Sequence, residues 1–171
     1  MAFVAAALEE GPTEVGGVIQ ASRVLVIGVG NAYRHDDAAG LVVARHLKDQ
    51  AHSSCEVHEH VGEGTGLMEL WKCAERVVVV DAVQSGAIAG TVHRFNVNLR
   101  SLPASMFRGS THAFGLNEAV ELSRALKQLP SNFIIYGIEG QNFDTGIGLS
   151  SAVLGAVNDL AEKLQHEVET M

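Results

Sequence analysis

The sequence predicts one three-layer α/β domain, in which a mostly parallel, twisted five-stranded sheet carries helices on both faces. Compact apolar runs alternate along the chain with segments whose apolar residues recur at helical spacing. The 171 residues are 47% hydrophobic, which is enough to bury one core of ordinary size. No repeat or linker divides residues 23–171, so we expect a single domain there, with residues 1–22 as a flexible N-terminal extension.

Five runs are expected to form the strands of this sheet. Residues 24–28, 77–83 and 133–138 are continuous apolar runs, typical of strands that are buried on both faces. Residues 55–61 alternate between polar and apolar types, which places this strand nearer an edge. Residues 91–97 form a weaker alternating run. The link before it is too short for a helical crossover, so we expect this strand to lie antiparallel beside 77–83.

Helices are expected between the strands, because apolar residues there recur every three or four positions. The first helix opens with Asp36 and Asp37, where the helix dipole favours negative charge. Ser150 or Ser151 is expected to be the N-cap residue of the last helix. The four expected helices cover residues 36–50, 66–75, 114–129 and 150–169.

Charge and cysteine content exclude several classes of function. The net charge is −8 and the basic residues are scattered, which argues against nucleic acid or an anionic membrane as a partner. Cys55 and Cys73 have no metal-type spacing and give no disulfide framework, as suits a reducing cytoplasm. The apolar run 2–8 is too short to span a bilayer and has no basic residues before it, so it is not a signal peptide. We therefore expect a cytoplasmic protein.

The glycine-rich segment 28–40, "GVGNAYRHDDAAG", follows the first strand and suggests a dinucleotide-binding turn. The fingerprint of that turn is G-x-G-x-x-G, and Gly28 and Gly30 fit its first two glycines. Tyr33 occupies the third position, however, and two acids follow where a phosphate would be repelled. No P-loop motif occurs elsewhere. Dinucleotide binding is therefore an alternative that the segment does not favour.

Two acidic residues follow the strand 24–28, and another lies near the end of the strand 77–83. If these strands are neighbours, their carboxyl ends form a ligand-binding crevice, and Asp36 or Asp37 faces Asp81 across it. An aspartate that ends a valine-rich strand is costly to bury unless it is paired, hydrogen-bonded or bound to a metal. Capping of the helix is the ordinary role of an acid in its first turn, and we assign that role to Asp36.

His112 is the third candidate. Ser110 and Thr111 are expected to cap a helix, which places His112 in its first turn, where the helix dipole keeps the imidazole neutral and available as a ligand or base. Taken alone, such a histidine is more often structural. Together with Asp37 and Asp81 it makes an O,O,N set suited to an ion of the zinc or nickel kind. Cysteine and serine nucleophiles are less favoured, because neither cysteine has a neighbouring base and no G-x-S-x-G motif occurs.

Five motifs occur in one order: "GVGNAYRHDDAAG", "GTGLMEL", "VVVVDAV", "STHAFGL" and "YGIEGQNFDTGIGLS". In this combination the chain resembles the [NiFe]-hydrogenase maturation endopeptidases over residues 23–165. The resemblance implies a hydrolase that removes a C-terminal extension from the hydrogenase large-subunit precursor after nickel insertion. It also implies that the precursor supplies the nickel, so that no tightly bound resident cofactor is expected, although zinc or cadmium could occupy the same ligands.

The resemblance further implies roles for individual residues. Asp37, Asp81 and His112 match the family's metal-contacting and catalytic residues. Four more residues, in the glycine-rich turns around the cleft, are expected to contact the substrate: Asn31, Gly64, Thr65 and Gly140.

Two departures from the family pattern affect the cleft rim: Leu67 stands where a glycine is common, and Gly140 where many members carry proline. We expect a monomer whose partner is the precursor. The alternative is a chaperone-like module that binds the precursor tail without cutting it.

Overall fold

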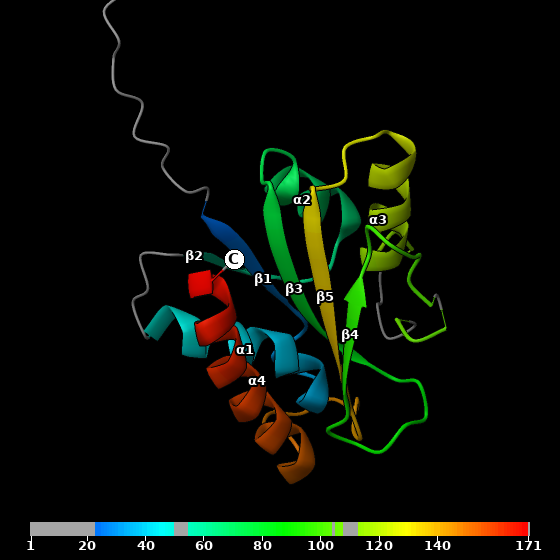
Figure 1. Ribbon diagram of the computed structural model, residues 1–171. Helices are drawn as coiled ribbons and strands as arrows, with labels where there is room; N and C mark the ends of the chain where they lie inside the picture. The colour runs from blue at the N-terminus through cyan, green and yellow to red at the C-terminus, as the bar shows by residue number, and fades with distance from the viewer. Residues whose placement is uncertain (1–22, 50–54, 104, 108–112, 171) are drawn as a thin grey trace, which may run out of the picture.

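The computed structural model describes residues 23–49, 55–103, 105–107 and 113–170. Its strands form a single five-stranded sheet in the order β2-β1-β3-β5-β4 (Figure 1). In chain order the elements are β1 (Val24–Val29), η1 (His35–Ala38, a 3-10 turn), α1 (Ala39–Asp49), β2 (Cys55–His60), α2 (Gly64–Trp71), β3 (Arg76–Val83), β4 (Val92–Asn96), α3 (Leu116–Ala125), β5 (Asn132–Glu139) and α4 (Ser151–Thr170).

The predicted fold class is confirmed. β1 pairs in parallel with both β2 and β3, β3 pairs in parallel with β5, and β4 is antiparallel. The edge position expected for 55–61 is also confirmed, since β2 ends the sheet next to β1. β2 lies on one side of β1 and β3 on the other, so the order in which strands are added reverses at β1, and the crevice at the carboxyl ends of β1 and β3 is the expected ligand site of such a sheet.

The neighbour predicted for residues 91–97 is wrong. β4 does run antiparallel, but it pairs with β5, and β5 separates it from β3. Burial explains the order: all but the first residue of β5 are buried, so this strand belongs inside the sheet. β4 has only exposed and half-buried residues, as an edge strand does.

Helices cover both faces of the sheet, with α1 and α4 on one face and α2 and α3 on the other (Figure 1). Alternate residues of β1 point to opposite faces, so that Val24 and Val26 pack with α1 and α4, and Leu25 and Ile27 pack with α2 and α3. Each face therefore has its own apolar cluster. None of the described helices has the length and apolar character that a membrane crossing requires.

Two glycines bring α1 very close to the sheet. A Cβ atom on Gly28 would lie 2.2 Å from the Gly40 carbonyl oxygen, and one on Gly40 would lie 2.2 Å from the Val80 carbonyl oxygen. Neither backbone could shift away without disturbing the sheet. Gly40 thus allows the close helix–strand approach that the third glycine allows in a dinucleotide turn. Tyr33, which occupies the position of that third glycine in the sequence, does not pack at this contact and is 69% exposed.

Helix boundaries differ from the prediction where side chains or turns intervene. The expected helix 36–50 begins as the 3-10 turn η1, so Asp36 and Asp37 precede α1. α2 begins two residues earlier than expected, because the Glu63 carboxylate accepts hydrogen bonds from the first free backbone amides of the helix. α3 ends at Ala125, four residues before the predicted end at 129, and Leu126 is 52% exposed.

Candidate functional site

Asp37 and Asp81 lie together at the carboxyl ends of β1 and β3. Pairing between these strands ends at Gly28 and Val80, so Asp81 is the first residue of β3 beyond the pairing. Asp37 belongs to η1, which follows β1 and contacts β3. The structure thus brings together the two acids that the sequence places at the same opening.

The negative charge of Asp37 affects the ionisation of Asp81. Burial raises the pKa of Asp81, the negative charge of Asp37 raises it further, and the Ala82 N–H, which donates at 2.8 Å, lowers it; the result is a pKa of about 7. Burial also raises the pKa of Asp37, against the lowering effect of the Arg34 charge and the Asn31 N–H. The pair is therefore poorly neutralised, and a cation between the two carboxyls would relieve their repulsion.

A glycine turn holds Asp37 in place. Gly30 has a φ of +152°, and a Cβ atom there would lie 1.9 Å from the Asp37 carbonyl oxygen. The Asn31 N–H donates to that same oxygen at 3.3 Å, and the Asp37 N–H donates to the Arg34 carbonyl at 3.0 Å. The Asn31 side chain is exposed at the rim, and its Oδ1 accepts from the Tyr33 N–H at 2.9 Å. The turn therefore needs glycine at position 30.

Asp36 has a different role from its neighbour and is not the helix cap that we predicted. It is completely buried, and its carboxylate accepts four hydrogen bonds: from the N–H groups of Gln141, Asn142 and Ser150 at 2.8, 2.9 and 2.7 Å, and from the Ser150 hydroxyl at 3.0 Å. Burial raises the pKa of Asp36, but these bonds outweigh it and keep the pKa below its ordinary value. Asp36 thus anchors the loop 140–150 that follows β5.

Glu139 is a second saturated carboxylate, and sequence reasoning missed it. It ends β5 and is 1% exposed. It accepts from the Ser85 N–H and hydroxyl, both at 2.7 Å, from the Gly86 N–H at 2.9 Å, and it contacts His93 Nε2 at 3.4 Å. Burial raises its pKa, and these partners lower it below the ordinary value. The signal that drew attention to Asp81, an acid closing an apolar strand, applies equally to Glu139.

Gly64 and Thr65 lie at the N-terminus of α2, beyond the carboxyl end of β2. Gly64 is buried against Phe114: its N–H donates to the Phe114 carbonyl at 2.9 Å, and an added Cβ would lie 2.3 Å from Phe114 Cδ1. Thr65 is exposed. Its N–H and hydroxyl donate to Glu63 Oε1 at 2.8 and 2.6 Å, and with the Gly66 N–H they lower the pKa of Glu63 to about 2. The Glu63 carboxylate therefore already occupies two helix amides that could bind an anion.

Gly140 is fixed by backbone contacts. Its N–H donates to the Val83 carbonyl at 3.0 Å, a bond that a proline at this position could not make. An added Cβ would lie 2.4 Å from Phe143 Cζ and 3.2 Å from Asp36 Cβ. The Phe143 ring thus fills the space beside Gly140, and the Phe143 carbonyl accepts from Arg34 Nε at 3.2 Å. Position 140 shapes the rim of the site through packing.

His112, with its expected caps Ser110 and Thr111, lies outside the described residues. Within those residues no group of three histidine, cysteine or acidic side chains is placed to hold a metal ion. The described part of the chain thus contains two of the three expected ligands, and the ligand set stays a prediction. Phe114, two residues after His112, contacts the start of α2 at the carboxyl edge of the sheet.

Comparisons with known proteins agree with the fold. The hydrogenase maturating endopeptidase HybD from E. coli is 22% identical, covers 86% of this chain and 93% of its own, and superposes with a TM-score of 0.69. The [NiFe] hydrogenase maturation protease HybD from Thermococcus kodakarensis is 23% identical, with coverage of 85% and 99% and a TM-score of 0.62. An endopeptidase from E. coli is also 23% identical, with coverage of 83% and 89% and a TM-score of 0.71.

The family assignment rests on the sequence. No curated protein matches the chain. The model of the hydrogenase maturation protease family, HycI, matches residues 43–167, a range that contains Asp81 and begins after Asp37. This match covers well over half of the 171 residues. The chain belongs to the hydrogenase maturation protease family.

Proposed function

We propose that this protein is the endopeptidase that removes the C-terminal extension of a nickel-loaded [NiFe]-hydrogenase large-subunit precursor. In this proposal Asp37, Asp81 and His112 contact the nickel that the precursor carries. The observation that supports it best is the poorly neutralised pair Asp37–Asp81 at the crevice between β1 and β3. The type of reaction, peptide-bond hydrolysis, is inferred from the membership in the hydrogenase maturation protease family.

The contrast between the saturated carboxylates Asp36 and Glu139 and the pair Asp37–Asp81 supports this assignment. Asp36 and Glu139 are saturated by hydrogen bonds from loops of the protein itself. Asp81 accepts from the adjacent Ala82 N–H, and its pKa remains raised to about 7. Groups whose pKa is shifted by burial and by a like charge are typical of functional sites. Asp37 and Asp81 are therefore the acids available to an external cation.

Nickel suits such a site as part of the substrate. Two carboxylates and one imidazole are borderline-hard ligands that nickel and zinc accept, but they leave several coordination positions open. The protein alone would hold an ion weakly, whereas a precursor that brings nickel with its own ligands would complete the coordination. A precursor without nickel would leave the two acids repelling one another. The protein would therefore bind the nickel-loaded precursor more tightly than the precursor without nickel.

Hydrolysis then requires water at the scissile peptide bond. The nickel of the docked precursor would polarise the peptide carbonyl or the attacking water. The water oxygen bonds to the carbonyl carbon, the C–N bond breaks, and the released amine takes up a proton. Asn31 and Thr65, which are both exposed near the crevice, are placed to contact the substrate backbone in this proposal. We expect the protein to act as a cytoplasmic monomer.

Processing can be tested with purified protein and nickel-loaded precursor, with the mass of the large subunit as readout. The wild type is expected to shorten the precursor, and Asp37→Asn to leave it uncut while its thermal unfolding is little changed. Asp144→Asn is the matched control, since Asp144 is an exposed loop residue. Normal processing by Asp37→Asn would remove that residue from the site. Binding of the precursor by the wild type with no change in its mass would favour the chaperone-like alternative.

The ligand set has a separate test in the isolated protein. We expect weak binding of Zn²⁺, Cd²⁺ or Ni²⁺ in titration calorimetry, because three ligands make an incomplete cage. His112→Ala should reduce this binding further. Metal binding that is unaffected by His112→Ala would show that His112 is not a ligand.

A further inference from the structure

A groove of about 510 Å³ opens beside the turn that holds Asp37. Its lining includes Gly30 and Asn31 from that turn and Val61 beyond the end of β2. The Gly30 N–H donates to the His60 carbonyl at 3.0 Å, and the Asn31 N–H donates to the Asp37 carbonyl, so the groove and the two-aspartate site share one backbone segment. A polypeptide bound at Asp37 would therefore lie next to the groove.

The walls of the groove are mostly apolar, and their polar residues are Asn31, Glu59 and His60. Tyr33 and Val61 are 69% and 66% exposed, and Leu41, which is 6% exposed, also lines the groove. The volume lies in the range of pockets that hold small ligands, so it fits one or two amino-acid side chains. Exposed apolar side chains around a hollow next to a reaction site indicate a surface that is covered when the substrate binds.

The charged residues of the groove determine which kind of substrate side chain it can accept. Glu59 is the acidic residue among those described as lining the groove. Its carboxylate accepts hydrogen bonds from Arg45 Nε and Nη2, at 3.0 and 2.7 Å, and from Lys48 Nζ, at 3.3 Å. These two cations lower the pKa of Glu59 against the raising effect of burial, so the cluster stays ionised and internally paired. The groove therefore offers no unpaired acid to a basic residue, and its walls favour an aliphatic or aromatic one.

We propose that this groove binds the precursor segment next to the scissile bond, in an extended conformation, and that an apolar side chain of that segment sits between Tyr33 and Val61. The inference rests on the proposed function, because it takes the precursor as the substrate. It assigns specificity to residues outside the metal-contacting set. Asn31, exposed at the same rim, is available to hydrogen-bond the backbone of the segment.

The test compares Val61→Asp with Leu99→Asp, a matched control. Leu99 is 77% exposed and follows β4 at the opposite end of the sheet. For processing of the nickel-loaded precursor, Val61→Asp should raise KM about tenfold, which corresponds to about 1.4 kcal/mol, with kcat changed less than twofold. Tyr33→Ala should act in the same direction. Leu99→Asp should leave both constants unchanged. Since Val61 is exposed, thermal unfolding is expected to show a folded Val61→Asp protein.

A double-mutant cycle identifies the residue that occupies the groove. Precursors carrying aspartate at single positions around the cleavage site are processed by the wild type and by Val61→Asp. At one apolar position the KM effects of the two substitutions should be non-additive, because they remove the same contact. Additive effects at every position would overturn the proposal, as would a Val61→Asp enzyme with unchanged KM or with a loss confined to kcat.

Failure of the groove and failure of the proposed function give different results. If the wild type processes the precursor and Val61→Asp has the same KM, the groove proposal alone is overturned. If the wild type binds the precursor without cutting it and Val61→Asp binds about tenfold more weakly, the groove is supported and the endopeptidase role is not. A wild type that neither binds nor cuts the nickel-loaded precursor would overturn both.

Discussion

Replacing Asp81 with asparagine should stabilise the folded protein more at pH 8 than at pH 5. Burial and the charge of Asp37 raise the pKa of Asp81 from 3.8 to about 7. Between these two values the folded protein keeps a proton that the unfolded chain has lost. Folding stability therefore falls as the pH rises from about 4 to about 7, and the full loss is present above pH 7. Asparagine carries no charge and does not undergo this loss.

The size of the effect follows from the difference between the two pKa values. About three units at 1.36 kcal/mol each correspond to about 4 kcal/mol. Asp81 is half-buried, so water screens part of the repulsion, and we expect about 2 kcal/mol at pH 8. At pH 5 only about a third of this loss of folding stability is present, because pH 5 lies about a third of the way from 3.8 to 7. Asparagine also keeps an oxygen for the Ala82 N–H, which donates to Asp81 Oδ1 at 2.8 Å.

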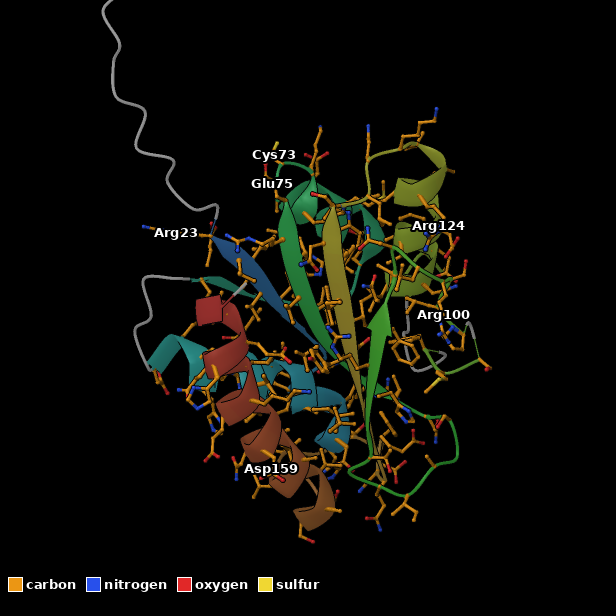
Figure 2. All side chains as sticks on the ribbon, viewed as in Figure 1. Arg23, Cys73, Glu75, Arg100, Arg124 and Asp159 are labelled. Atoms are coloured by element: carbon orange, nitrogen blue, oxygen red, sulfur yellow. The ribbon has the colours of Figure 1, made fainter. Side chains whose placement is uncertain are left out.

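Urea unfolding at pH 5 and pH 8, in the presence of EDTA, measures this difference. The stabilisation by Asp81→Asn should be larger at pH 8 by about 1 kcal/mol or more. Asp159→Asn is the control, because Asp159 is an exposed residue of α4 (Figure 2). An equal gain at both pH values would show that ionisation of Asp81 is not the cause. A loss of stability at pH 8 would refute the proximity of the two carboxyls.

Three other substitutions test the frame around the site. Asp36→Asn should destabilise the fold by about 2–4 kcal/mol in thermal unfolding, because an NH₂ group would face the N–H donors of the 140–150 loop; unchanged stability would contradict the anchoring role. Gly30→Ala should abolish precursor processing, since its Cβ would displace Asp37, whereas Gly155→Ala, in open space on α4, should retain activity and add about 0.5 kcal/mol of stability. Glu139→Gln should speed proteolysis of the loop after β3, because its Ser85 and Gly86 contacts weaken; cleavage at the wild-type rate would argue against that anchor.

Much of the site's location could be predicted from local sequence alone. Continuous valine-rich runs and alternating runs distinguish the interior strands from the edge strands, since burial on two faces and on one face require different residues. The neighbouring positions of β1 and β3 then put Asp37 and Asp81 at one crevice. The neighbour of β4 was predicted wrongly from the short link after β3, because a short link favours an antiparallel strand but does not decide whether another strand, here β5, lies between the two.

The chemical state of each acid was decided by tertiary structure. Asp36 and Asp37 are adjacent in the sequence, yet the donors to Asp36 lie 105, 106 and 114 residues away in the chain. Those donors saturate Asp36 and leave Asp37 beside Asp81, where burial raises the pKa of both. A local pattern determines that an acid lies at a strand end. Whether that acid is an anchor or is available to a ligand depends on donors that only the folded chain brings to it.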